Sequence, residues 1–218
     1  MDRSSRNRLN ERLLPLFAGE TLFDRIARAV CRAGCLPRKE LYEAWEVARR
    51  VHRRFRGGRV VDLAAGHGLL AQILLLLDPS VPGALAVDRR IPENARRLAT
   101  ELQSDWPGLA ARFSFLEGDL GEVVLRNDDL VVSVHACGGL TDQVLERAMA
   151  AGARVAVLPC CHDLKYADTG GFQGWLDGPL AVDVTRAALL RSHGYRVYTQ
   201  LIPVDITPKN RLLMAEPG

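Results

Sequence analysis

Short apolar runs alternate with amphipathic stretches between residues 59 and 158 of this chain. In the stretches between the runs, apolar side chains recur at helical spacing, which is typical of helices with one buried face. Strands that alternate with helices indicate parallel βαβ units, in which helices cover both faces of one sheet. The predicted strands are 60–63, 84–87, 113–116, 130–134 and 155–158, and the predicted helices are 69–77, 92–103 and 141–150.

The last part of the chain follows a different pattern. Tyr195–Val204 and Arg211–Ala215 have the composition of strands, and only residues 205–210 separate them. So short a connection can join an antiparallel pair but cannot carry a parallel crossover. We therefore predict an α/β fold with a seven-stranded, mostly parallel sheet that ends in an antiparallel C-terminal strand pair.

Residues 1–37 are predicted to form a helical N-terminal extension. Apolar residues recur at helical spacing in two stretches, 9–14 and 22–30, and Pro15 separates them. The pattern of apolar and polar residues changes after this extension, and residues 38–218 are predicted to form a single α/β domain.

The cysteine count and the start of the chain bear on the cellular compartment. Five cysteines are an odd number, and the first twelve residues are polar and rich in arginine. Such a start lacks the apolar core of a secretory signal, and no apolar run is long enough to span a bilayer. We therefore expect a cytoplasmic protein with reduced thiols and no membrane partner. Cys31 and Cys35, four residues apart, are predicted to be small buried side chains on one helix face.

The net charge is only +3, but basic residues concentrate near the N-terminus. Residues 1–56 contain fourteen Arg and Lys against seven Asp and Glu, so the remaining residues carry a net charge of −4. A basic segment beside a mildly acidic domain favours a nucleic-acid partner, with RNA as the candidate. The alternative is a general use of arginine, because the chain contains only three lysines.

The sharpest local pattern runs from a strand through a glycine turn into a helix. It contains Gly66-x-Gly68-x-x-Ala71, where glycines let the backbone turn and approach a ligand that a Cβ would exclude. Free N–H groups at the start of the helix suit an acidic group on that ligand. The spacing alone fits either a dinucleotide such as NAD or S-adenosylmethionine.

Three acidic residues stand near the ends of three successive predicted strands. Asp62 belongs to the first strand, Asp88 closes the second, and Asp119 follows the third. The carboxyl ends of parallel strands meet at one edge of an open sheet, where such sheets bind ligands, and Asp88 is placed to accept both ribose hydroxyls. Asp62 would repel a pyrophosphate but suits the ammonium group of S-adenosylmethionine, which favours that cofactor over NAD.

At these residues the sequence resembles the class I methyltransferases, which use S-adenosylmethionine. Asp62-x-Ala64-x-Gly66-x-Gly68 is similar to their first motif, with Ala64 in place of its usual first glycine. The resemblance implies a Rossmann-like fold and S-adenosylmethionine as the cofactor. It also implies that Asp119 holds the adenine amino group.

Three other motifs narrow the resemblance to a methyltransferase-domain family marked by His-Ala-Cys and Pro-Cys-Cys. They are Val134–Asp142, Leu158–His162 and Ile206–Arg211, and the likeness covers about residues 38–217. Relatives of that family include the ribose 2′-O-methyltransferase of the tRNA acceptor stem. The resemblance therefore implies RNA as one class of methyl acceptor.

The fourth and fifth strands are each followed by residues with reactive side chains. His135 and Cys137 follow the fourth strand, and Cys160 and His162 follow the fifth. We predict that these four residues line a catalytic pocket beside the donor methyl group, where His135 also contacts the cofactor. His135 is a candidate general base because its ordinary pKa lies near neutrality. The alternative is that His135 only fixes the local loop and that the cysteines are core residues.

Neighbouring residues extend this predicted pocket. Pro159 would stiffen its turn, and Asn210 or Arg211 would approach from the loop between the last two strands. Enzymes that methylate amino groups of adenine or cytosine often carry an Asn/Asp-Pro-Pro-aromatic tetrapeptide after the fourth strand. This chain has Val-His-Ala-Cys there, which argues against that activity.

The same two segments contain side chains of the types that bind metals. Cys161 joins the four predicted catalytic residues in this set. Consecutive cysteines on an extended backbone point to opposite faces, and the spacing matches no standard zinc pattern. We therefore predict no metal, with convergence of these five side chains as the alternative.

Several classes of methyl acceptor stay open at this point. RNA, a protein side chain and a small metabolite each fit a methyltransferase of this kind, and RNA is slightly favoured by the basic residues 1–56. A non-catalytic module that only binds the cofactor is the alternative from a different class.

Overall fold

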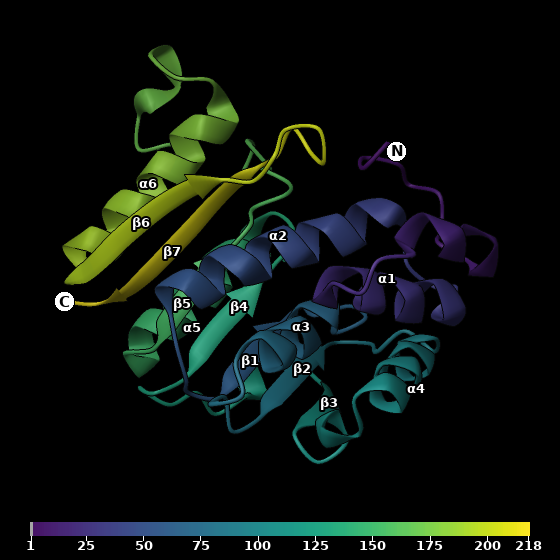
Figure 1. Ribbon diagram of the computed structural model, residues 1–218. Coiled ribbons are helices and arrows are strands. Elements are labelled where there is room, and N and C mark those ends of the chain that lie inside the picture. The colour runs from purple at the N-terminus through teal and green to yellow at the C-terminus, as the bar shows by residue number, and fades with distance from the viewer. Residues whose placement is uncertain (1) are drawn as a thin grey trace.

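The computed structural model describes residues 2–218 and contains one seven-stranded sheet (Figure 1). The strand order is β3-β2-β1-β4-β5-β7-β6, and only the pairs that involve β7 are antiparallel. The predicted mostly parallel sheet with an antiparallel C-terminal pair is confirmed. The strands are β1 Val60–Leu63, β2 Ala84–Asp88, β3 Phe113–Glu117, β4 Leu130–Ser133, β5 Arg154–Val157, β6 Tyr195–Leu201 and β7 Arg211–Pro217.

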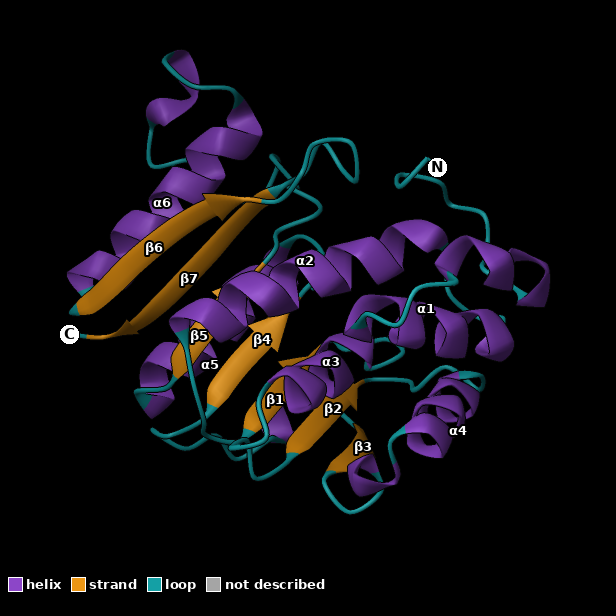
Figure 2. Ribbon diagram, viewed as in Figure 1, coloured by secondary structure: helices purple, strands orange, loops and turns teal. Residues whose placement is uncertain are grey.

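Helices cover both faces of the sheet (Figure 2). Helices α1 to α4 share a core with one face, and α5 and α6 share a second core with the other. The α-helices are α1 Leu22–Ala33, α2 Arg38–Arg54, α3 Leu69–Leu77, α4 Ala95–Asp105, α5 Gly139–Ala151 and α6 Gly178–Ser192. Short 3-10 helices are η1 Glu11–Phe17, η2 Pro107–Leu109, η3 Leu120–Glu122 and η4 Phe172–Gly174.

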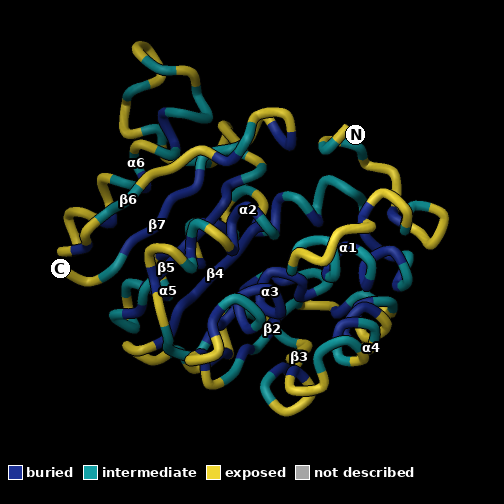
Figure 3. Tube along the Cα trace, viewed as in Figure 1, coloured by how far each residue is buried: buried dark blue, intermediate teal, exposed yellow. Residues whose placement is uncertain are grey.

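The alternation of side chains along the strands explains the two cores. Val60 in β1 and Val132 in β4 face helices α1 to α4, whereas Val61 and Val131 face the other layer. Successive residues of a strand point to opposite faces, so a strand that is buried on both faces is apolar throughout. Figure 3 shows the central strands buried along most of their length.

The N-terminal residues pack against the sheet domain through the same core. Leu9, Phe17 and Ile26 are buried there with residues of α2 and α3. The helix α1 begins at a Thr21 cap and ends at Gly34, which has a φ of 64°. The predicted helix over 22–30 is present within α1. The prediction that Pro15 ends the first helix is wrong, because Pro15 lies inside the 3-10 helix η1. The boundary at residue 37 stays a prediction.

The two cysteines of the extension are buried as predicted, but they do not share a helix. Cys31 lies in α1, whereas Cys35 follows the Gly34 cap and lies outside the helix. Burial raises the pKa of each thiol to about 11, so both are protonated packing groups at neutral pH. Within the described residues, no helix combines the length and apolar character needed to cross a membrane.

Helix α6 was missed by the sequence analysis. Its exposed side carries Val184 and Leu189, so the contrast between apolar and polar positions that marks an amphipathic helix is weak. Local signals for the helix were nevertheless present. Asp177 caps its first turn by accepting a hydrogen bond from the Leu180 N–H, and Pro179 occupies that turn.

Candidate functional site

The turn between β1 and α3 has the backbone geometry that the glycine pattern predicts. Gly66 and Gly68 have φ values of 54° and 67°, in the left-handed region that favours glycine. Ala64, at 55°, is the non-glycine residue with a positive φ within residues 2–218. A Cβ on Gly68 would lie 3.0 Å from carbon atoms of Ala86, Phe113 and Phe115, so a side chain here would crowd three neighbours in addition to straining the backbone.

Asp62 is a buried carboxylate beneath this turn. Asp62 is 1% exposed, and neither of its carboxyl oxygens has a partner at hydrogen-bonding distance and angle. Burial raises the pKa of Asp62 to about 8. A weak contact with the Ala71 backbone lowers the pKa only in part, and the nearby charge of Asp88 adds to the rise. Without a ligand the group is therefore largely protonated at neutral pH, and a cationic group of a ligand would favour its ionised form.

Asp88 fixes the glycine turn from the end of β2. Its Oδ2 accepts a hydrogen bond from the Gly66 N–H at 2.9 Å, and its Oδ1 accepts one from the Arg90 N–H at 3.2 Å. Each carboxylate oxygen can accept a further hydrogen bond. Asp88 can therefore hold the turn and bind a ligand hydroxyl at the same time.

A cavity of about 220 Å³ lies at the carboxyl ends of β1, β2 and β3. It brings together Asp88 and Asp119, as predicted from their strand positions. Asp119 sits at the rim, where its Oδ2 accepts a hydrogen bond from Arg89 Nη2 at 3.1 Å. A hydrogen bond from the Gly121 N–H and the charge of Arg89 hold the pKa of Asp119 below its ordinary value. The cavity is lined by Ala64, Val87, Asp88, Arg89, Gly118, Asp119, Leu120 and Leu140.

His135 packs against the glycine turn. A Cβ built on Gly66 would lie 3.7 Å from its Cδ2 atom, and His135 shares a small cavity with His67 and with Glu40 of α2. Burial, together with the charge of Lys39, lowers the pKa of His135 to about 4. The imidazole is therefore neutral at physiological pH and weakly basic.

The segments after β4 and β5 bring three sulfur atoms together. Cys137 Sγ lies 3.1 Å from Cys160 Sγ, and Cys160 Sγ lies 3.8 Å from Cys161 Sγ. The prediction that consecutive cysteines would diverge is wrong, because β5 ends at Val157 and the backbone of the two cysteines is not in a strand. Cys137 and Cys161 are exposed at the surface and Cys160 is half-buried, so they are not core residues.

The thiols of this cluster influence one another. Burial would raise the pKa of Cys161, but hydrogen bonds with Cys137 and Cys160 and the charge of Lys209 lower it below the ordinary thiol value. Burial and the contact with Cys137 raise the pKa of Cys160. The Cys161 thiol therefore loses its proton more readily than the Cys160 thiol.

His162 lies outside the sulfur cluster and takes part in a network of charged residues. Its Nε2 lies 2.7 Å from Asp183 Oδ1, and Arg211 Nε donates to Asp183 Oδ2 at 2.7 Å. Arg186 in α6 joins the same network by donating to Asp183 Oδ1 at 3.3 Å, and it also donates to both oxygens of Asp142, at 2.6 and 3.0 Å. These partners could not be predicted from the sequence, because they are far apart along the chain.

The loop between β6 and β7 meets the cluster through a different residue from those predicted. Asn210 Nδ2 donates to the Ile202 carbonyl at 2.9 Å, and Arg211 is held by Asp183. Lys209 instead approaches the cysteines, with its Nζ 3.9 Å from Cys161 Sγ. The residues proposed for one pocket therefore lie in three surroundings: the glycine turn, the sulfur cluster and the charged network.

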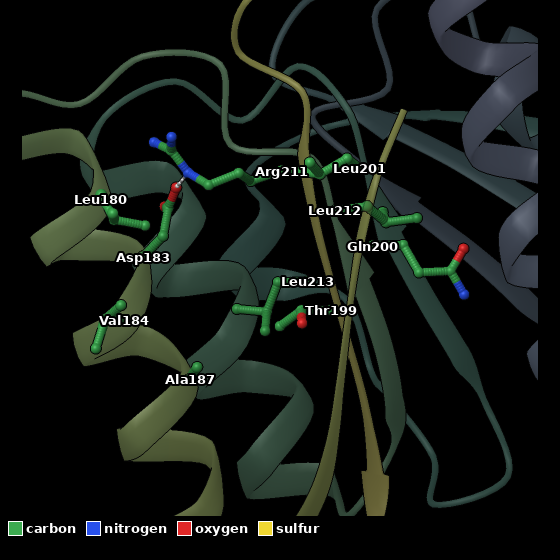
Figure 4. A pocket seen from close by; sticks show the side chains of 10 residues that line it. All are labelled: Leu180, Asp183, Val184, Ala187, Thr199, Gln200, Leu201, Arg211, Leu212 and Leu213. Atoms are coloured by element: carbon green, nitrogen blue, oxygen red, sulfur yellow. Dashed lines mark hydrogen bonds and ion pairs between the residues drawn. The ribbon is translucent and has the colours of Figure 1, made fainter. Parts of the chain in front are cut away.

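A larger hollow of about 390 Å³ lies between α6 and the terminal strand pair (Figure 4). Its walls are mainly aliphatic, and the Arg211–Asp183 ion pair lies at one end. It adjoins β6 and β7, whereas the predicted cofactor residues lie at the ends of β1, β2 and β3. This hollow is therefore a separate feature of the opposite half of the sheet.

More than half of the chain matches a known family of proteins. A model described as a methyltransferase domain matches residues 38–167, which is more than half of the chain. The chain is also similar to the glutathione S-transferase C-terminal domain-containing protein of Mus musculus, with 24% identity over 197 residues that cover 74% of this chain and 30% of the mouse protein. The chain thus spans less than a third of the length of that curated relative.

Two solved structures illustrate the likeness in fold. The M1A22 tRNA methyltransferase TrmK of B. subtilis is 18% identical, with a TM-score of 0.53, and the match covers 81% of this chain and 65% of TrmK. An O-methyltransferase family protein from Burkholderia thailandensis is 19% identical, with a TM-score of 0.54, and the match covers 98% and 65%. At such identities the likeness shows a shared fold and no more.

Proposed function

Because the chain belongs to this methyltransferase-domain family and has the class I methyltransferase fold, we propose that it transfers the methyl group of S-adenosylmethionine to an acceptor. The cofactor is proposed to lie across the glycine turn, in the cavity at the ends of β1, β2 and β3. One observation carries this proposal: a cavity lined by Asp88 and Asp119 lies at the carboxyl end of β1, the strand in which Asp62 is buried without a side-chain partner.

Each of these residues fits a different part of the cofactor. Asp62 would pair with the ammonium group, which would supply the partner that its carboxylate lacks. Asp88 would accept the ribose hydroxyls, and Asp119 at the rim would accept a hydrogen bond from the adenine amino group. Leu120 and Leu140 offer apolar surface to the adenine ring.

The chain's own contribution to the chemistry is mainly positioning. When bound, S-adenosylmethionine supplies an electrophilic methyl group on a sulfonium. The glycine turn lets the backbone approach without side chains, and the apolar wall of the cavity excludes water from one side. His135 remains a candidate base beside the turn, although its lowered pKa makes it a weak one.

Calorimetric titration of the full chain tests the cofactor assignment. We expect S-adenosylhomocysteine, the product form, to bind in the micromolar range or tighter, while NAD gives no heat of binding. Asp62 is the reason, since the ammonium group of the cofactor can stabilise its ionised form, whereas a pyrophosphate cannot. Micromolar binding of NAD with no response to S-adenosylhomocysteine would overturn the proposal.

The Asp88→Ala variant is expected to weaken binding of S-adenosylhomocysteine by about 1.5–3 kcal/mol, because hydrogen bonds to a charged acceptor contribute about that much. Part of the loss comes from the turn, since the Gly66 N–H also loses its acceptor. Asp88→Asn keeps one acceptor oxygen, so it should lose less affinity for S-adenosylhomocysteine than Asp88→Ala. The matched control is Asp128→Ala, an exposed residue just before β4. Unchanged affinity in a folded Asp88→Ala protein would remove Asp88 from the site.

RNA is the acceptor class that we propose. Its support is charge: residues 1–56 carry an excess of seven positive charges. Some of these residues are in ion pairs with acidic side chains, such as Arg32 with Glu101 and Asp105, but Arg6, Arg12 and Arg53 are exposed. These exposed arginines are available to contact phosphate groups.

The decisive experiment follows radiolabelled methyl groups into a lysate separated into RNA, protein and small molecules. We expect the label to appear in RNA. We also expect the affinity of the protein for RNA to fall steeply as the salt concentration rises. Label in protein or in small molecules would overturn the RNA assignment while leaving methyl transfer intact. Cofactor binding without any transfer would identify a non-catalytic module instead.

A further inference from the structure

The sulfur cluster of Cys137, Cys160 and Cys161 has the arrangement of a metal site. The three Sγ atoms all lie within 4.8 Å of one another. A zinc ion binds thiolates at about 2.3 Å, so two sulfurs of a tetrahedral site are about 3.8 Å apart. The Cys160–Cys161 separation of 3.8 Å matches this spacing, and the other two distances need only small side-chain movements.

The backbone holds these cysteines together without help from the sulfurs. The Gly138 N–H donates to the Cys161 carbonyl at 3.1 Å, which joins the segment after β4 to the segment after β5. Arg186 Nη2 donates to the Gly138 carbonyl at 3.3 Å, and His162 is anchored on Asp183. Residues next to each of the two cysteine segments are therefore fixed to α6. A site prepared in this way binds an ion without first ordering its ligands.

The surroundings of the cluster also favour bound thiolates. Lys209 Nζ lies 3.9 Å from Cys161 Sγ, where its positive charge offsets part of the negative charge of three thiolates. A disulfide between Cys137 and Cys160 would use two of the sulfurs and would not explain the third, which lies against both of them. Three converging thiols beside a cation are better explained by a thiophilic metal ion.

We propose that Cys137, Cys160 and Cys161 bind one zinc ion as thiolates, with a fourth coordination position left open to solvent or to a substrate. Three protein ligands and one open position are the pattern of reactive rather than purely structural zinc sites. Binding releases the thiol protons to solvent and involves no change in oxidation state. The proposal does not depend on the cofactor or on methyl transfer.

Zinc content and cobalt spectroscopy of the full chain test this site. Protein loaded with zinc under reducing conditions and then freed of excess metal is expected to keep about one zinc per chain, measured by elemental mass spectrometry. Cobalt(II) is expected to give thiolate-to-cobalt charge-transfer absorption and the visible bands of tetrahedral coordination. Cys160→Ala and Cys161→Ala should each weaken zinc affinity by about 100-fold or more in competition with a chromophoric chelator.

The control removes a thiol outside the cluster. Cys35→Ala deletes a buried cysteine after α1 and is expected to leave both zinc content and the cobalt spectrum unchanged. If a cluster variant fails to fold, the cobalt spectrum of the unaltered chain still decides the question. Folded, reduced protein that retains no zinc and gives no thiolate-to-cobalt band would overturn the proposal. A Cys137–Cys160 disulfide in peptide mapping, with no metal uptake after reduction, would overturn it in favour of a redox pair.

Discussion

Replacement of Arg186 by alanine is expected to lower the free energy of unfolding by about 1.5–3 kcal/mol, because its buried guanidinium loses charge-assisted hydrogen bonds. The Arg186 side chain is 3% exposed and donates to Asp142, Asp183 and the Gly138 carbonyl. Burial alone would raise the pKa of Asp183, but His162 and Arg211 lower it, so this carboxylate stays charged. The variant would leave charged groups in α6 and α5 without their shared partner.

Urea unfolding followed by circular dichroism would measure this loss. The matched control is Arg191→Ala, an exposed arginine in the same helix, for which a change within about 0.5 kcal/mol is expected. A loss below about 1 kcal/mol for Arg186→Ala would mean that the network adds little to stability. Faster reaction of Cys137 with a thiol reagent in the folded variant would show, in addition, that Arg186 fixes the segment after β4.

The Asp62→Asn variant is expected to be more stable than the unaltered chain at pH 9, by on the order of 6 kcal/mol. The unfolded carboxyl loses its proton near pH 3.8, whereas in the folded chain the pKa is about 8. Between these values the folded chain holds a proton that the unfolded chain has lost. Stability therefore falls as the pH rises through this window, and the cost is complete above pH 8. Asparagine stays neutral and avoids this cost.

Unfolding curves between pH 4 and pH 9, without cofactor, would check this dependence. The two proteins should be similar in stability near pH 4 and diverge steadily up to about pH 8. Asp128→Asn, at an exposed position, should run parallel to the unaltered chain throughout. If the stability of Asp62→Asn ran parallel to that of the unaltered chain over this pH range, the pKa of Asp62 would not be the one that is raised. In the opposite direction, Asp62→Asn should weaken cofactor binding, because the partner of the ammonium group is lost.

Much of the fold could be predicted because its signals are local. β1 at Val60–Leu63 and α3 at Leu69–Leu77 begin and end as the hydrophobic pattern predicts. The positions of Asp88 and Asp119 followed from strand ends, since parallel strands bring those ends to one edge. Topology alone thus placed these two acids in one cavity.

The parts that could not be predicted depend on long-range contacts. Nothing in the local sequence indicates that Arg186 meets Asp142, which lies 44 residues away. The convergence of Cys160 and Cys161 depends on where β5 stops, and a strand that continued by a few residues would have separated their sulfurs. Helix α6 was missed because its apolar residues are spread over both exposed and buried sides.

The position of β7 between β5 and β6 has a consequence for biosynthesis. β6 precedes β7 in the chain, yet it contacts the rest of the sheet only through β7. While the ribosome is still producing residues 211–217, β5 presents an unpaired edge and β6 has no strand to join. Unpaired edges invite association with other chains. The nascent protein is therefore most vulnerable to aggregation just before β7 emerges, and β7 closes that period by pairing on both of its sides.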